Sequence, residues 1–291
     1  MSVGGASLGL LPIRIAQIAS LETQEHSQSA KRILEKMNLA KKVIRGAFRR
    51  AGFEVSRIKS NEDRERLRSD FDEATQHLCQ FVRPFTMTSP EKIFALRQAV
   101  MHVIQHGVEG DMVECGVWKG GSMMAIARTL LESGAAERNL YLFDTFEGMP
   151  APGDEDVSFD GKPAHQLLSE SDKESNWVWA YSAVEEVKRN VLSTGYPAER
   201  ISFIKGKVEE TIPSKAPAKI ALLRLDTDWY ESTYHELVHL FPRLSSGGIL
   251  IIDDYGHWKG ARKAVDEYFS QQKLDLLLHR IDYSGRMCVK H

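Results

Sequence analysis

From residue 111 onward, short runs of apolar residues alternate with segments in which apolar residues recur every three or four positions. Short apolar runs are typical of buried strands, and the second spacing is typical of helices that pack through one face. The pattern predicts strands at 111–115, 140–143, 201–205, 220–225 and 248–252. It predicts helices at 122–133, 181–192, 232–241 and 259–270. Such alternation indicates a mostly parallel sheet.

Two more strands are expected at the end of the chain, at 276–281 and 286–289, with no helix between them. This pair must be antiparallel, because a parallel connection needs a long crossover. Five strand–helix units closed by an antiparallel hairpin describe the seven-stranded, Rossmann-like α/β sheet of class I methyltransferases better than the dehydrogenase version of that sheet.

Residues 31–59 predict a basic amphipathic helix. Ten Lys or Arg stand against two Glu in this segment, a local charge of +8 in a chain whose formal charge is −2. One helix face carries the apolar residues, which are Ile33, Met37, Ala40, Ile44 and Phe48. We expect this helix to pack on the main domain or on a second subunit of a homo-oligomer, or to lie on an anionic membrane surface. The expected organisation is an N-terminal helical appendage, 1–75, followed by an α/β domain, 76–291.

Composition narrows the class of protein. A length of 291 residues suits one large α/β domain with an appended segment, and 42% hydrophobic with 27% charged residues is ordinary for a globular protein. The weak net charge gives no reason to expect nucleic-acid binding. Three widely spaced cysteines favour a reducing, cytoplasmic setting. Neither a signal peptide nor a membrane-spanning stretch is expected, so any contact with the inner face of a membrane would be peripheral.

An acidic insertion containing Gly and Pro is expected between the second and third strands, at 151–175. Its seven acidic residues and its turn-forming residues predict a mobile loop or lid.

A glycine-containing turn follows the first predicted strand. Glu114 lies near the end of this strand, Gly116 and Gly120 lie in the turn, and the next helix is expected to begin at Ser122. Glycine lets a ligand approach the backbone and bind its N–H groups, although a purely structural tight turn is the alternative. The spacing is not that of a dinucleotide fingerprint, so the turn suits a ligand without a diphosphate. Asp144, at the tip of the neighbouring strand, is a candidate acceptor for both ribose hydroxyls, or else a helix N-cap.

Four carboxylates follow the fourth and fifth strands: Asp226 and Asp228 after one, Asp253 and Asp254 after the other. The carboxyl ends of parallel strands meet at the edge where ligands of open α/β sheets bind. Four uncompensated carboxylates would repel one another, so we expect a cation, and oxygen ligands favour Mg²⁺. Solvated turns are the alternative. In an extended strand end, Asp226 and Asp228 would point the same way, which places a base beside the metal.

With these motifs in place, the chain resembles the macrocin O-methyltransferase (TylF-type) family of sugar O-methyltransferases. The resemblance runs from about Phe85 to the C-terminus and leaves the first sixty residues outside it. It rests on five stretches, in the order FTMTS at 85–89, VECGVWKGGS at 113–122, FDTFEGMP at 143–150, LRLDTDWYEST at 223–233 and DDYG at 253–256.

The resemblance implies S-adenosylmethionine, Mg²⁺ and methylation of a sugar hydroxyl on a natural-product glycoside, while the basic helix resembles an appendage of enzymes that modify surface glycans. By this resemblance Asp226, Asp253 and Asp254 match the metal ligands, and Asp228 matches a proposed base, with His257 as the weaker alternative. The segment that closes over the cofactor contains Thr86, Met87 and Ser89. We expect the remaining cofactor contacts from Glu114, Gly116, Gly120, Ser122, Asp144, Asp226 and, beside the adenine, Gly206, Lys207 and Val208.

Three other functions compete with this one. Asp226-Thr227-Asp228 is also a DxD motif of metal-dependent nucleotide-sugar glycosyltransferases, but the glycine turn and Asp144 favour a nucleoside bound without a diphosphate. A dinucleotide oxidoreductase is disfavoured by the glycine spacing. A sheet that serves only as a binding module is disfavoured by the four clustered acids.

Overall fold

The predicted sheet forms the centre of the computed structural model, which describes residues 70–172 and 177–291. Seven strands lie in the order β3-β2-β1-β4-β5-β7-β6. The parallel strands are β1 (Asp111–Cys115), β2 (Leu140–Asp144), β3 (Ile201–Lys205), β4 (Ile220–Leu225) and β5 (Leu244–Ile252). The antiparallel strands are β6 (His279–Arg280) and β7 (Arg286–Val289). The predicted fold class is confirmed.

Two strand boundaries differ from the prediction. β5 begins at Leu244, four residues before the expected start, because Gly247 has a φ of 79° and forms an irregularity inside the strand. β6 has two residues instead of the expected six. Leu276 and Leu278 pack against the core while Leu277 is exposed, so this run alternates like a strand without pairing as one.

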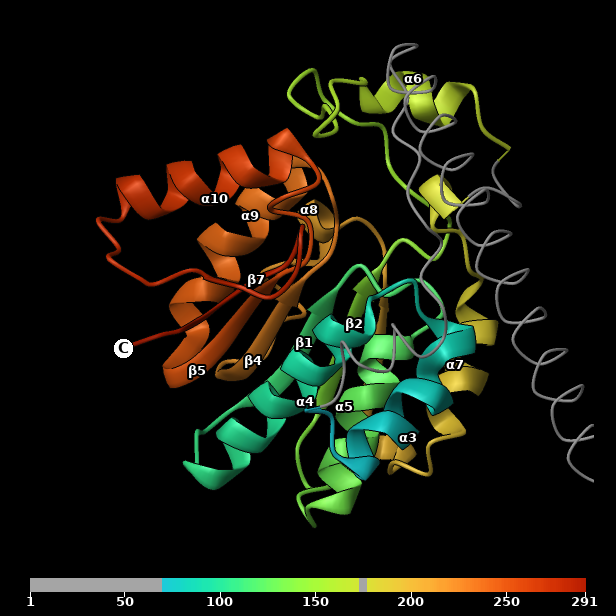
Figure 1. Cartoon of the computed structure of the whole chain (residues 1–291), viewed down its shortest axis with the longest axis vertical. Coiled ribbons are helices and arrows are strands. Elements are labelled where there is room, and N and C mark those ends of the chain that lie inside the picture. The colour runs from blue at the N-terminus through green and yellow to red at the C-terminus, as the bar shows by residue number, and fades with distance from the viewer. Residues whose placement is uncertain (1–69, 173–176) are drawn as a thin grey trace, which may run out of the picture. The chain divides into compact units, whose positions relative to one another are not determined.

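Helices cover both faces of the sheet (Figure 1). On one face lie α3 (Glu73–Val82), α4 (Pro90–Gln105), α5 (Gly121–Glu132) and α7 (Val184–Leu192). On the other face lie α8 (Val208–Thr211), α9 (Tyr230–Leu240) and α10 (Lys259–Gln271). The short elements are α6 (Ala164–Ser169), η1 (Arg83–Phe85), η2 (Trp177–Trp179), η3 (Ala198–Arg200) and η4 (Phe241–Arg243). No helix among the described residues is long and apolar enough to cross a membrane.

Helices α3 and α4 were not predicted, although both have clear start signals. The Asp72 carboxylate accepts from the Thr75 N–H at 2.7 Å, and the Ser89 hydroxyl oxygen accepts from the Lys92 N–H at 3.2 Å. Pro90 follows as the first residue of α4, a position that suits proline. Ser89 therefore starts a helix, and its hydroxyl also donates to Asp282 at 2.8 Å.

The core lies on both faces of the sheet, as expected for parallel strands. All six residues of β4 are buried, and apolar clusters fill the space between the sheet and each helical layer. Arg224 is the one charged residue of β4, and it is 2% exposed. A buried guanidinium in an apolar strand requires acidic partners nearby.

The insertion at 151–175 is attached to the helical layer through several contacts. Asp156 is 1% exposed and accepts from the backbone N–H of Tyr230 at 2.8 Å, where α9 begins. Ser158 forms a β-bridge with Trp258, and the Lys259 N–H donates to the Val157 carbonyl at 2.8 Å. The insertion is thus fastened to the start of α9 and of α10, and its mobility stays a prediction.

The basic segment 31–59 lies outside the described residues. The described sheet belongs to the unit Arg68–His291. The predicted basic helix and the boundary at residue 75 stay predictions.

Candidate functional site

A cavity of about 550 Å³ opens at the carboxyl ends of the parallel strands. This is the edge where ligands of open α/β sheets bind. Most predicted site residues line it, namely Thr86, Met87, Gly116, Ser122, Asp144, Gly206, Lys207, Val208, Asp226, Asp228, Asp253 and Asp254. Ser89, Glu114 and Gly120 are not among the lining residues. The structure therefore brings the predicted residues from all five parallel strands to one place.

The glycines after β1 allow three segments to pack closely around the cavity. Gly116 has a φ of 79°, and a Cβ there would lie 2.0 Å from the backbone oxygen of Asp226. A Cβ on Gly121 would lie 2.5 Å from the carbonyl oxygen of Phe85. Gly120 is the N-cap residue of α5, and no described side chain caps this helix. Its N-terminal N–H groups are suited to bind a carboxylate.

Asp144 ties the end of β2 to the turn after β1. One of its oxygens accepts from the N–H groups of Val117 at 2.6 Å and Trp118 at 3.2 Å, and the other accepts from the Phe146 N–H at 2.6 Å. Burial raises the pKa of Asp144, while these hydrogen bonds oppose the rise. The Thr145 hydroxyl also donates to Oδ1, at 3.4 Å, so a ribose hydroxyl would share the acceptor sites of Asp144 with groups of the protein. Its role as ribose acceptor stays a prediction.

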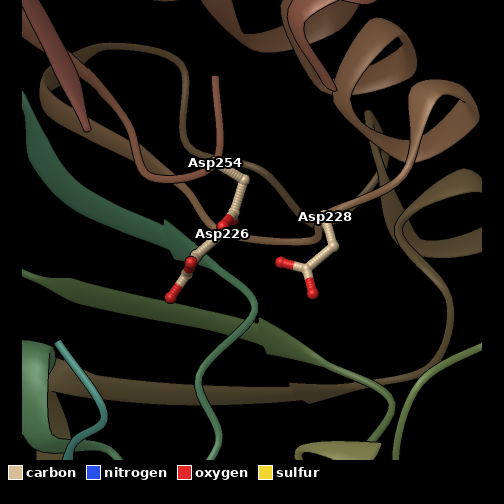
Figure 2. A group of neighbouring side chains, drawn as sticks. All are labelled: Asp226, Asp228 and Asp254. Atoms are coloured by element: carbon tan, nitrogen blue, oxygen red, sulfur yellow. The ribbon is translucent and has the colours of Figure 1, made fainter. Parts of the chain in front are cut away.

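Three of the four predicted carboxylates form a compact group. Asp226, Asp228 and Asp254 each offer an oxygen within 4.8 Å of the others (Figure 2). Asp228 has a φ of 69°, so the backbone is left-handed there and the argument from an extended strand end does not hold. The left-handed turn nevertheless brings Asp228 to Asp254, to which it is hydrogen-bonded. Backbone strain of this kind clusters at functional sites.

Asp253, the fourth carboxylate, is paired with two buried cations. One oxygen lies 2.5 Å from Arg224 Nη2, and the other contacts Lys92 Nζ, which also donates to the Asp253 carbonyl at 3.1 Å. Burial opposes ionisation of Asp253, but Arg224 and Lys92 outweigh it and hold the pKa of this carboxyl below its ordinary value. The premise of four uncompensated acids was therefore wrong, because two cations lie among them.

Arg224 joins the carboxylates of three strands. Its Nη1 lies 2.6 Å from Glu114 Oε1 and 2.7 Å from Asp226 Oδ2, and its Nη2 donates to the Thr88 hydroxyl at 3.2 Å. Burial raises the pKa of Glu114 to about 7 against the opposing effect of Arg224. Glu114 therefore contacts Arg224, and its predicted contact with the cofactor stays a prediction.

Neither Lys92 nor Glu236 was predicted as a site residue. Lys92 lies on the unpredicted helix α4 and lines the cavity. Glu236, on α9, is fully buried and accepts from the Thr227 hydroxyl at 2.9 Å, so it holds the turn between Asp226 and Asp228. The sequence carries no local signal for either contact, because each joins residues from different elements.

The donor set fits a hard divalent cation. Burial raises the pKa of Asp226 and of Asp254 well above the ordinary value, and raises that of Asp228 to about 7. The Oδ2 atom of Asp254 is buried and has no hydrogen-bond partner in the described part of the chain. A cation that binds oxygen would satisfy this atom and favour the ionised carboxylates.

We expect the metal-free protein to lose thermal stability as the pH rises from about 4 to 7. Asp228 and Glu114 have folded-state pKa values of about 7, above their unfolded values, so the stability present below the unfolded pKa is lost as the pH rises through the folded one. Mg²⁺ at neutral pH should raise the melting temperature by about 2–4 °C or more, the effect of 1 kcal/mol on a domain of this size. Scanning fluorimetry in chelator or Mg²⁺, with KCl at matched ionic strength, measures both. A melting temperature that rises with pH in chelator would contradict this.

Known proteins resemble the chain in sequence and structure. Residues 20–290 match the family model described as macrocin-O-methyltransferase (TylF). The demethyldecarbamoylnovobiocin O-methyltransferase of Streptomyces niveus is 34% identical over 200 residues, 69% of this chain and 73% of that enzyme. The mycinamicin III 3''-O-methyltransferase of Micromonospora griseorubida is 31% identical over 200 residues, 69% and 76% of the two chains. The solved structure of the O-methyltransferase NovP is 33% identical with a TM-score of 0.62, over 71% of this chain and 82% of that one.

The family match begins at residue 20, well before Phe85. The expectation that the first sixty residues lie outside the resemblance was therefore wrong for residues 20–60. The basic segment 31–59 falls within the matched range.

Proposed function

Because this chain belongs to the macrocin-O-methyltransferase family, we propose that it transfers a methyl group from S-adenosylmethionine to a hydroxyl of a sugar or glycoside, with Mg²⁺ in the acidic part of its cavity. The methyltransferase sheet and the family make the chain an O-methyltransferase rather than a DxD glycosyltransferase. The observation that supports the metal is the group of Asp226, Asp228 and Asp254 beside the buried, unpartnered oxygen of Asp254.

The other side of the cavity suits the cofactor. We assign the ribose to Asp144, the amino-acid part to the N-terminus of α5 with Ser122, and the adenine to the segment 206–208 after β3. Thr86 and Met87 line the cavity from the segment before α4, while Ser89 supports that segment as the N-cap of α4. A volume of about 550 Å³ is within the usual range of small-molecule sites.

The cofactor supplies an electrophilic methyl group, and Mg²⁺ lowers the pKa of a nearby hydroxyl and orients it. Asp226, Asp253 and Asp254 would hold the cation. Asp253 is ionised, and its oxygens keep one acceptor site each beside Arg224 and Lys92. Asp228 would accept the proton of the acceptor hydroxyl, because a pKa of about 7 suits a general base at neutral pH. In the alternative arrangement that the geometry permits, Asp228 replaces Asp253 as third ligand.

Asp144→Ala should weaken binding of S-adenosylhomocysteine by about 1–3 kcal/mol, because hydrogen bonding between the ribose and a carboxylate would be lost. Isothermal titration calorimetry measures the affinity, and circular dichroism confirms that the variant is folded. Glu199→Ala, which removes an exposed carboxylate outside the cavity, is the matched control. Unchanged affinity in Asp144→Ala would remove this residue from the cofactor site.

We place the enzyme in the cytoplasm, with a natural-product glycoside or a surface glycan as acceptor. The basic segment 31–59 would contact either an anionic membrane surface or a second subunit. Sedimentation with anionic vesicles at low and high salt tests the lipid contact, and absence of binding at low salt would exclude it.

A further inference from the structure

Three aromatic side chains meet beside the acidic end of the cavity. His257 and Tyr283 line the cavity, and the Tyr283 hydroxyl lies 3.2 Å from His257 Nδ1. The ring of Phe159, from the insertion, lies 5.5 Å from the His257 ring and 6.3 Å from the Tyr283 ring, measured between centroids. We call Phe159, His257 and Tyr283 the aromatic subsite.

Buried contacts hold the aromatic subsite in place. The His257 ring packs edge-on against Trp258, which is 1% exposed, at 4.9 Å between centroids. The residue before Phe159 forms the β-bridge with Trp258, so the same tryptophan fixes the insertion and the histidine. The His257 N–H donates to the Asp254 carbonyl at 2.9 Å, which ties the subsite to the carboxylate group.

The aromatic subsite is open to solvent. Phe159 is 62% exposed and Tyr283 is 57% exposed, and Met87, on the cavity wall, is 49% exposed. A group of exposed apolar side chains beside a cavity is typical of a ligand-binding surface. Flat rings held at fixed positions favour a flat, apolar ligand group.

The basic side chains that line this end of the cavity are already paired with carboxylates. The Lys and Arg residues that line the cavity in the described chain are Lys92, Lys207 and Arg224. Lys92 and Arg224 are paired with carboxylates, so their charge is already compensated. Lys207 follows β3, whereas His257 follows β5, and three strands lie between these two in the sheet. Among the basic side chains that line the cavity, a diphosphate at the aromatic subsite would therefore find none free to pair with it, and the proposed Mg²⁺ would be its counter-charge.

We propose that the aromatic subsite binds an aromatic group linked to the acceptor sugar, so that the enzyme acts on a neutral aryl glycoside rather than on a nucleotide-diphosphate sugar. This inference rests on the proposed function, because it needs the sugar hydroxyl beside Asp228 and Asp254. The sugar lies at the carboxylates, and its aglycone extends outward between Phe159 and Tyr283. The insertion thereby selects the acceptor.

Calorimetry on the full chain, with Mg²⁺ and S-adenosylhomocysteine present, tests this with a panel of pyranosides prepared as methyl, hexyl and 4-nitrophenyl glycosides. The 4-nitrophenyl compounds should bind about tenfold more tightly than the methyl compounds, and more tightly than the hexyl compounds. The nucleotide sugar dTDP-L-rhamnose should bind no more tightly than methyl α-L-rhamnoside.

Phe159→Ala and Tyr283→Ala should each reduce the aryl preference by about fivefold or more, with unchanged affinity for S-adenosylhomocysteine. Tyr283→Phe keeps the ring and should keep the preference. Leu277→Ala, at an apolar side chain that is 84% exposed and does not line the cavity, is the matched control.

Equal affinity for methyl and aryl glycosides, a preference that survives both alanine variants, or hexyl binding as tight as aryl binding would overturn the assignment. Tighter binding of the nucleotide sugar, or no binding of any glycoside by a chain that binds S-adenosylhomocysteine, would also overturn it. Failure of the unaltered chain to bind S-adenosylhomocysteine would instead contradict the proposed function, so the two failures are distinguishable.

Discussion

Arg224→Met should destabilise the folded protein by about 3–5 kcal/mol, the usual effect of removing one partner from a buried charge network. Arg224 is 2% exposed and pairs with Glu114, Asp226 and Asp253, so its loss leaves three carboxylates without their main counter-charge. Urea denaturation in chelator gives the free energy of unfolding. Methyl transfer should be lost as well, because Asp226 and Asp253 would no longer be held toward the cavity.

Two variants separate the charge effect from the loss of a large side chain. Arg97→Met removes an arginine of α4 whose ion pairs with Asp72 and Glu132 are both 3.7 Å long and partly exposed, and it should cost at most about 1 kcal/mol. Adding Glu114→Gln to Arg224→Met should recover part of the stability, since one uncompensated buried charge is removed. A cost below about 1 kcal/mol for Arg224→Met, or simple additivity in the double variant, would show that the network is not held by charge.

The centre of the sheet could be predicted because β4 and the second half of β5 are buried on both faces, which leaves a nearly continuous apolar run in each. Helix α4 also had a sequence signal: Ile93, Leu96, Val100 and Val103 recur at intervals of three and four after a Ser-Pro start. The predicted helices do not include α4, and the predicted site therefore lacks Lys92. Lys92 and Asp253 are 161 residues apart in the sequence, and no local pattern predicts a contact between residues so widely separated.

The candidate site was predictable to the extent that it follows from topology. Asp144, Asp226 and Asp254 lie at or just beyond the carboxyl ends of parallel strands. These ends lie at the same edge of the sheet, independently of the side chains that they carry. The left-handed backbone at Asp228 and the docking of Phe159 against His257 depend on tertiary packing instead. Loops that select acceptors also vary most in sequence, so the aromatic subsite has no pattern of its own.

Removing divalent metal with a chelator should abolish methyl transfer, and Mg²⁺ should restore it. A sugar hydroxyl is a weak acid, and a carboxylate with an ordinary pKa near about 4 is too weak a base to ionise it unaided. The proton moves more readily when the pKa values of the hydroxyl and the carboxyl group lie closer together. Burial reduces their difference by raising the pKa of Asp228 to about 7, and a bound cation would reduce it further by lowering the pKa of the hydroxyl. Full activity in chelator would remove the metal from the reaction.

Asp228→Asn should lower kcat by about 10²–10⁴, the usual contribution of a general base, while binding of Mg²⁺ and of S-adenosylhomocysteine changes little. Asparagine keeps the shape of the side chain but cannot take the proton. In the unaltered enzyme kcat should rise with pH, with a midpoint at or below about 7, because the base must be deprotonated and a bound cation lowers its pKa. This rise should be absent from the residual activity of Asp228→Asn.

Metal affinity decides between the two arrangements of the carboxylates. Asp226→Asn and Asp254→Asn should weaken Mg²⁺ binding by about tenfold or more, since even residues that only support ligands contribute this much. Asp253→Asn should do the same if Asp253 is the third ligand. Loss of Mg²⁺ affinity in Asp228→Asn, with affinity retained in Asp253→Asn, would place Asp228 among the ligands, as the 4.8 Å grouping permits. The base would then lie elsewhere, and His257, which lines the same cavity, would be the next side chain to replace.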